Sequence, residues 1–376
     1  MKKIISVIIL LTLLFSTVYS KEIEEINAKS YILVDGKTGN VLLEKNPDEP
    51  MPPASITKIM VMLLAMEAID NGLISTDDLV VVTDTAAIHE GSHVFLEVGE
   101  EMSVNDLLKA IAVASGNDAA NMMGEFLCGT QEKFVARMNE RAKELNMKNT
   151  NFINCNGLDA TNHLSTARDI SIMTYELLKH PKIHEYTTIW MDTLRNGKFQ
   201  LANTNKLIRY YEGATGMKTG STSKAGFCIS ATATRNDVDL IAVTMNSETS
   251  KLRFADASTL LNYGFSNYSN VKLCDNGQEF GAVKVYDGEK KEVEVLTNIE
   301  STILVENSYK GLIQHKLNIP DSVTAPIKKG QKIGEFTAYN GENLIKTIDI
   351  VAKEDVNKLS FAFLFKNLFI SYIKSV

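Results

Sequence analysis

The chain has 376 residues, of which 44% are hydrophobic and 23% are charged, and its formal net charge is −7. This length suggests two or three domains, and the hydrophobic fraction excludes an intrinsically disordered chain. The negative charge argues against a nucleic-acid-binding protein, which normally carries a basic face. The mean hydropathy of −0.06 is too low for a multi-span membrane protein, and four cysteines are too few for a disulfide scaffold.

Residues 1–20 have the pattern of a secretory signal peptide. Lys2 and Lys3 form a basic start, an apolar run follows over residues 4–15, and Val18-Tyr19-Ser20 resembles a cleavage site. An uncleaved membrane anchor is the alternative, but the apolar run is shorter than the ~20 residues that a spanning helix needs. We therefore expect an exported protein that is cleaved after Ser20.

Export would permit disulfides, and the number of cysteines is even. Cys128, Cys155, Cys228 and Cys274 are widely spaced and match no metal-binding motif. We expect four buried thiols that do not pair.

The elements of the first domain follow from apolar patterning. Two apolar runs, Tyr31–Val34 and Val41–Leu43, flank a Gly-containing turn and predict a β-hairpin. After a proline-rich approach, residues 56–69 are apolar on nearly every side, which indicates a helix in the interior of a domain. Further predicted elements are helices at Val104–Ala114 and Gln131–Leu145 and strands between Gly226 and Asn246. This order predicts an α+β domain over residues 21–268.

The pattern changes over residues 269–355, where short alternating strands predict a small all-β domain. Residues 283–286 and 293–295 alternate around Asp287-Gly288. Another pair of apolar runs flanks Asn340-Gly341, which is a strong hairpin signal. No cluster of catalytic residue types occurs here, so we interpret this domain as a spacer.

Residues 356–376 predict an amphipathic helix. Phe361, Phe365 and Phe369 fall on one arc, and no acidic residue occurs after Asp355, whereas three lysines do. Such a helix would lie in a membrane interface. The alternative is a last helix docked on the β-domain, but so many phenylalanines would then leave a large exposed patch. We favour the membrane anchor.

Ser55-Ile56-Thr57-Lys58 is the first of three motifs with catalytic residue types. On a helix, residues three apart share one face, so the Lys58 amine reaches the Ser55 hydroxyl. The helix N-terminus adds unpaired backbone N–H groups beside that oxygen. Lys58 lies in an apolar stretch, where desolvation lowers its pKa and makes it a usable base. The same spacing recurs at Ser221–Lys224, Ser269–Lys272 and Ser371–Lys374, but only Ser55 begins a buried helix.

Two further motifs follow along the chain. Ser115-Gly116-Asn117 suits a loop that hydrogen-bonds a substrate and passes a proton, whereas the similar Ser103-Val104-Asn105 reads as a helix N-cap. Lys218-Thr219-Gly220 leads into an apolar strand, whereas the other Lys-Thr-Gly tripeptide of the chain, Lys37-Thr38-Gly39, occupies a hairpin tip. A strand with Lys and Thr on its rim can bind a carboxylate, and its backbone can offer an N–H to a developing oxyanion.

The three motifs in this order resemble the active-site set of penicillin-binding proteins and serine β-lactamases. Their surroundings look like those of the low-molecular-mass D-alanyl-D-alanine carboxypeptidases: Pro53–Lys58, Ala114–Ala120, Lys218–Gly226 and, in the second domain, Ala325–Gln331. The resemblance covers the mature chain nearly end to end. It implies a β-lactamase/transpeptidase-like α+β domain, with an antiparallel sheet and a helical cluster, then the all-β domain and the amphipathic helix.

The resemblance implies a serine-type D-Ala-D-Ala carboxypeptidase at the extracytoplasmic face of the membrane or in the cell wall. Its substrate would be the peptidoglycan stem peptide, and β-lactam antibiotics would inhibit it covalently. Ser55 would attack the carbonyl of the penultimate D-alanine, Lys58 would act as its general base, and Ser115 would relay a proton to the departing D-alanine. No metal or organic cofactor is implied.

The resemblance also implies a set of substrate-binding residues. They are Asn117 for the substrate amide, Lys218 and Thr219 of the Lys218-Thr219-Gly220 motif for the terminal carboxylate, the backbone N–H groups of Ser55 and Ser221 for the oxyanion, and Arg253 for the carboxylate. Arg253 could equally be a surface ion-pair residue. Ser221 stands where part of the family has a histidine. The detailed substrate preference of those family members therefore cannot be carried over to this chain.

The sequence leaves several alternative functions to compare with this interpretation. The nearest is a serine β-lactamase, but the Glu-x-x-Leu-Asn of one class is missing, and Glu144-Leu145-Asn146 lacks its spacing. A Ser-His-Asp hydrolase would carry G-x-S-x-G and a metallohydrolase H-E-x-x-H, and neither motif occurs. A sensor or wall-binding module that is acylated by penicillin without turnover stays open.

Overall fold

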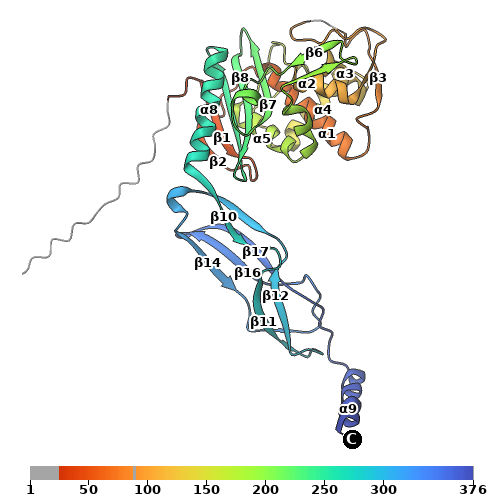
Figure 1. Cartoon of the computed structure of the whole chain (residues 1–376), viewed down its shortest axis with the longest axis vertical. Helices are drawn as coiled ribbons and strands as arrows, with labels where there is room; N and C mark the ends of the chain where they lie inside the picture. The colour runs from red at the N-terminus through yellow and green to blue at the C-terminus, as the bar shows by residue number, and fades with distance from the viewer. Residues whose placement is uncertain (1–24, 88–89, 376) are drawn as a thin grey trace, which may run out of the picture.

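A five-stranded antiparallel sheet forms the centre of the N-terminal body in the computed structural model, which describes residues 25–87 and 90–375 (Figure 1). Its strands lie in the order β2-β1-β9-β8-β7. Their bounds are Ser30–Asp35 for β1, Val41–Lys45 for β2, Ala214–Thr222 for β7, Gly226–Arg235 for β8 and Val238–Ser247 for β9. The predicted hairpin is confirmed, since Leu33 pairs with Leu43. Strand β7 is an edge strand, so one side of its backbone faces no neighbouring strand.

Both faces of this sheet are covered, which explains its nearly continuous apolar strands. Side chains of a strand point alternately to its two faces. Ile32 and Val34 of β1 therefore join a large cluster with the helices, whereas Tyr31 and Leu33 join a second cluster on the opposite face. Helix α8, Ser250–Asn267, covers that second face.

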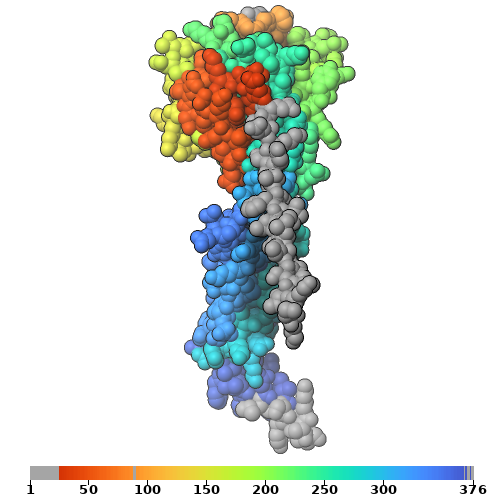
Figure 2. Space-filling model, turned by 90° about the vertical axis from the view of Figure 1, so that its left-hand side faces the viewer, coloured from red at the N-terminus to blue at the C-terminus, as the bar shows by residue number. Residues whose placement is uncertain are grey.

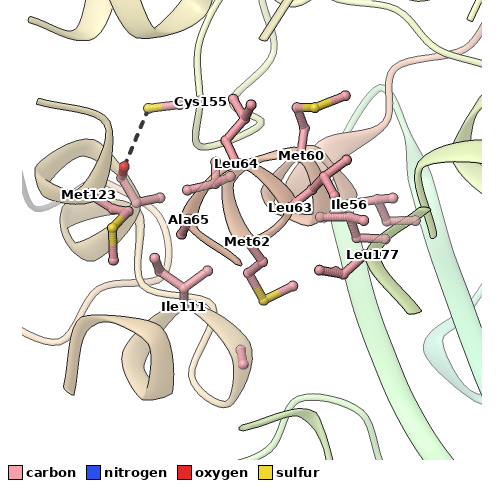
Figure 3. Packing of buried hydrophobic residues seen from close by; sticks show 14 of the residues in the cluster. Ile56, Met60, Met62, Leu63, Leu64, Ala65, Ile111, Met123, Cys155 and Leu177 are labelled. Carbon is pink, nitrogen blue, oxygen red and sulfur yellow. Dashed lines mark hydrogen bonds between the residues drawn. The ribbon is translucent and has the colours of Figure 1, made fainter. Parts of the chain in front are cut away.

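The predicted interior helix is confirmed as α1, Lys58–Asp70, which follows the 3₁₀ helix η1, Ala54–Thr57. Ten of its 13 residues are buried, and they face every direction around the axis. Figure 3 shows Met60, Met62 and Leu63 among side chains from other elements, including Ile111 and Leu177. A helix apolar all round is stable only inside a core, so α1 places η1 at the centre of the domain.

Other elements surround α1. The helices are α2 (Val104–Ala112), α3 (Asn117–Cys128), α4 (Gln131–Glu144), α5 (Ala167–Leu178), η2 (Pro181–Ile183), α6 (His184–Thr187) and α7 (Leu207–Tyr210). The strand pairs are β3 (Leu79–Val81) with β4 (Glu101–Ser103), and β5 (Met191–Leu194) with β6 (Phe199–Ala202). Ser103 caps α2 as predicted, because its hydroxyl accepts the Asp106 N–H at 3.0 Å.

The C-terminal body is all-β, as the sequence predicts, and lies below the first body along the long axis (Figures 1 and 2). It has its own apolar core, separate from the two clusters of the first body. Its elements are β10 (Tyr268–Cys274), β11 (Glu279–Tyr286), β12 (Glu292–Thr297), β13 (Ser301–Glu306), η3 (Asn307–Tyr309), β14 (Ile313–Asn318), β15 (Ser322–Thr324), β16 (Lys332–Asn340) and β17 (Asn343–Ala352). The hairpin around Asn340-Gly341 is confirmed, since β16 pairs with β17.

A last helix, α9 (Phe361–Ser375), stands at the far end of the molecule (Figure 1). Among residues 25–87 and 90–375, no helix has the length and apolarity needed to cross a bilayer. The predicted signal peptide lies outside the described residues. The four cysteines are unpaired, as expected, but Cys128 is half-buried rather than buried.

Candidate active site

Ser55 and Lys58 are in contact, as their spacing predicts, but the local structure differs from the prediction. Ser55 lies in η1 rather than in the α-helix, and α1 begins at Lys58. Lys58 Nζ is 2.9 Å from Ser55 Oγ. Ala54, directly before the serine, has a left-handed φ of +49°, which is a strained conformation for a residue other than glycine. Such strain is common where a side chain must be aimed at a substrate.

The amine of Lys58 has no exposed surface and three oxygen neighbours. Besides Ser55 Oγ, its Nζ lies 2.6 Å from Asn117 Oδ1 and 2.6 Å from the carbonyl oxygen of Asn156. Burial disfavours the charged ammonium and lowers the pKa of Lys58 to about 7. Because a lysine with this pKa is about half neutral at pH 7 and largely neutral above it, it can accept a proton from a neighbouring hydroxyl.

The second motif faces this pair from the start of α3. Ser115 is buried and has a left-handed φ of +62°. Both ends of the Asn117 side chain are engaged, since Oδ1 accepts from Lys58 and Nδ2 donates to the Glu90 carbonyl at 2.6 Å. The amide of Asn117 thus orients the lysine, a contact that the predicted role in holding substrate did not include.

Asp118 fixes the loop that holds Asn117. Its carboxylate is buried and accepts the backbone N–H groups of Val94 and Leu96 at 3.0 and 3.1 Å. The same loop provides the Ser92 carbonyl, which accepts the Asn117 N–H at 2.7 Å. Sequence reasoning missed Asp118, because an aspartate in the first turn of a helix ordinarily interacts with that helix's own N–H groups.

The third motif lies on the edge strand β7. Lys218 and Thr219 are buried, and Lys218 Nζ donates to the Thr219 carbonyl at 3.0 Å. Burial, followed by the nearby charges of Lys58 and Arg253, lowers the pKa of Lys218 well below its ordinary value. The Thr219 hydroxyl donates to Thr204 Oγ1 at 2.8 Å.

Close packing against η1 explains why the third motif ends in glycine. A Cβ on Gly220 would lie 2.9 Å from the Pro53 carbonyl oxygen and 3.0 Å from the Ile56 nitrogen. Only a residue without a side chain lets β7 approach the backbone on both sides of Ser55 this closely. The motif therefore sets the distance between the nucleophile and the edge strand.

Arg253 of α8 reaches the same strand from the other side of the sheet. Its Nη1 donates to the carbonyl oxygens of Gly220 at 3.1 Å and Cys228 at 3.4 Å. Its side chain is buried, and its guanidinium lies over the ring of Phe254, 4.6 Å from the centroid. Arg253 is therefore no surface ion-pair residue, and it supports β7 directly.

The loop that follows α4 completes the site, and sequence reasoning missed it. Asn156 takes part through its backbone carbonyl, which leaves no signal in residue type. Gly157 has a φ of +90°, and a Cβ there would lie 2.0 Å from the Ala54 carbonyl oxygen. The loop thus rests directly on the backbone of the nucleophile. Within the described residues, no group of three or more His, Cys, Asp or Glu side chains is placed to hold a metal ion.

The site combines three features: a serine hydroxyl in contact with a buried lysine, a second serine on the facing segment, and an edge strand that carries Lys-Thr-Gly. Together they define the penicillin-binding class of serine acyl-transferring enzymes. Comparison with known families narrows this class to one family. The family model described as "D-alanyl-D-alanine carboxypeptidase" matches residues 17–249, and that of the penicillin-binding protein 5 C-terminal domain matches residues 268–358. The chain therefore belongs to the D-alanyl-D-alanine carboxypeptidase family.

Individual relatives agree with this assignment. The chain is 42% identical over 338 residues to D-alanyl-D-alanine carboxypeptidase DacF of Bacillus subtilis, covering 89% of this chain and 87% of that protein. Penicillin-binding protein 5 from Haemophilus influenzae superposes with a TM-score of 0.77 at 31% identity, covering 89% and 99% of the two chains. Penicillin-binding protein D2 from Listeria monocytogenes, in its ampicillin-bound form, superposes with a TM-score of 0.59 at 32% identity. This match covers 64% of this chain and 98% of that protein's chain. The predicted transpeptidase-like α+β domain followed by an all-β domain is confirmed, as are the enzyme class and the reaction.

Replacing Gly220 by alanine tests the spacing of the site. We expect Gly220→Ala to lower kcat/KM for D-alanine release about a hundredfold, because the new Cβ displaces β7 from Ser55. Gly311→Ala is the matched control, since a Cβ there meets nothing within 4 Å. Equal activity of the two variants would contradict this account of the third motif.

Proposed function

We propose that this carboxypeptidase works through an acyl-enzyme on Ser55, with Lys58 as the general base. The observation that carries the proposal is the 2.9 Å contact between Ser55 Oγ and a buried amine whose pKa is about 7. Neutral Lys58 takes the hydroxyl proton while Oγ attacks the carbonyl carbon of the penultimate D-alanine. The C–N bond then breaks, which leaves an ester on Ser55 and releases D-alanine.

Proton delivery to the leaving group is assigned to Ser115. The departing amine needs one proton to leave as D-alanine, and Lys58 carries the proton taken from Ser55. Ser115 passes this proton on and is held in a left-handed conformation two residues before Asn117, the partner of Lys58. Water then attacks the ester, with Lys58 again as base, and hydrolysis restores the free Ser55 hydroxyl.

Strand β7 is assigned to bind the C-terminal end of the substrate. Lys218 and Thr219 receive the terminal carboxylate, and the backbone N–H groups of Ser55 and Ser221 stabilise the oxyanion. An arriving carboxylate favours the charged form of Lys218, whose pKa burial has lowered in the free enzyme. The buried guanidinium of Arg253 adds positive charge behind the strand and fixes Gly220.

Removing the nucleophile tests this mechanism. We expect Ser55→Ala to abolish both D-alanine release from a D-Ala-D-Ala peptide and covalent labelling by penicillin, because in the free enzyme no other hydroxyl of the described residues hydrogen-bonds to Lys58 Nζ. Ser269→Ala is the control, since Ser269 has the same spacing to a lysine but lies on β10. Assays of free D-alanine and of the mass of the penicillin adduct measure the two effects.

Persistent release from Ser55→Ala would contradict the assignment of the nucleophile. Penicillin labelling of the wild-type enzyme without any release of D-alanine would favour the sensor alternative.

We further propose that the enzyme acts outside the cytoplasm, with α9 lying in the membrane interface. The helix stands at the far end of the β-body (Figure 1). Its Phe361, Phe365 and Phe369 side chains are exposed, Phe361 to 83%. Exposed aromatic side chains beside lysines, with no acidic residue after Asp355, suit an anionic lipid surface. The all-β body then holds the active site away from that surface.

Vesicle binding tests the role of α9. We expect the chain to co-sediment with vesicles of mixed anionic and neutral lipids. The variant Phe361→Ser/Phe365→Ser should lose at least tenfold in affinity, since it removes two rings that the lipid would bury. The control is Leu312→Ser/Leu317→Ser, which removes exposed apolar side chains from the β-body. Equal binding of both variants would show that α9 is not the anchor.

A further inference from the structure

A carboxylate without a cationic partner lies at the end of β7. Asp159 Oδ1 accepts the Thr222 hydroxyl at 2.7 Å. Asp159 is half-buried, and within residues 25–87 and 90–375 no nitrogen of a lysine, arginine or histidine forms an ion pair with it. A partly desolvated charge usually has a partner, so one without a partner is a candidate for binding a cation from outside.

The histidine closest to this carboxylate along the loop does not neutralise it. His163 Nδ1 accepts the Ile153 N–H at 2.9 Å, so that nitrogen carries no proton, and Nε2 lies 2.9 Å from the Thr57 hydroxyl. Burial lowers the pKa of His163 to about 4, which keeps the ring uncharged at neutral pH.

Asp159 is fixed close to the reacting atoms. It lies two residues after Gly157, whose backbone rests on Ala54, and three after Asn156, whose carbonyl contacts Lys58. Its partner Thr222 directly follows Ser221, the residue assigned to the oxyanion hole. Thr222 Oγ1 also accepts the Ala225 N–H at 3.0 Å, which holds the threonine in place.

The direction of the bound peptide follows from the roles proposed for β7. The terminal carboxylate lies at Lys218 and Thr219, and the scissile carbonyl lies at Ser221. The substrate therefore runs antiparallel to β7, from its C-terminus at Lys218 toward its N-terminal part at Thr222. At about 3.4 Å per residue, the residue before D-Ala-D-Ala lies beside Thr222 and Asp159.

We propose that Asp159 binds a cationic side chain on the residue that precedes D-Ala-D-Ala in the substrate. The proposal rests on the proposed function, because that function sets the direction of the peptide. Asp159 Oδ1 stays with Thr222, and Oδ2 accepts from the ammonium group. The enzyme thus selects stem peptides whose third residue from the C-terminus carries a free amine.

Two peptides that differ in one charge test this inference. They are Nα-acetyl-Lys-D-Ala-D-Ala and the same peptide with its side-chain amine acetylated. We expect kcat/KM for D-alanine release to be about fivefold to tenfold higher for the free amine, the size of a charge-assisted hydrogen bond at a half-buried site. Asp159→Asn keeps an acceptor for Thr222 and loses only the charge. In this variant the ratio of kcat/KM for the free-amine peptide to kcat/KM for the acetylated peptide should fall to about one.

Asp77→Asn is the matched control, because it removes one exposed carboxylate of the same domain outside the site and should keep the wild-type ratio. Release from both peptides at equal rates in the wild type, or an unchanged ratio in Asp159→Asn, would overturn the role of Asp159 and leave the proposed function intact. Release from neither peptide would overturn the proposed function and this inference together.

Discussion

The site and the core both depend on one buried amine. Lys58 is enclosed at the start of a helix that is buried on every side, and its Nζ is held by oxygens from three separate segments. An uncompensated ammonium in such a place is unfavourable, so burial itself produces the neutral base that the reaction needs. The apolar packing of α1 and the chemistry of Ser55 are therefore one feature rather than two.

Backbone conformation brings the surrounding segments close enough to reach this amine. Ala54 and Ser115, in the first and second motif segments, adopt left-handed conformations. Gly157 and Gly220 let a loop and a strand contact the backbone around Ser55. Strained residues persist only where the surrounding packing enforces them. The helical cluster, the edge strand and the loop after α4 together provide that packing.

Much of this architecture could be predicted from the sequence, because apolar periodicity and turn residues determine the hairpins, the interior helix and the all-β body. The three motifs also identify Ser55, Lys58 and Ser115 by residue type. Asn156 could not be found in this way, since it contributes a backbone carbonyl. Asn117 and Arg253 were recognised by type, but their contacts to Lys58 and Gly220 depend on packing between distant segments.

The rate of acylation by penicillin as a function of pH tests the central claim most directly, because the base acts only when Lys58 is neutral. Below pH 7 the second-order rate constant should fall about tenfold per pH unit, and it should level off above an apparent pKa near 7. A rate that is constant from pH 5 to pH 9, or that rises only near the ordinary pKa of lysine at about 10, would contradict the account.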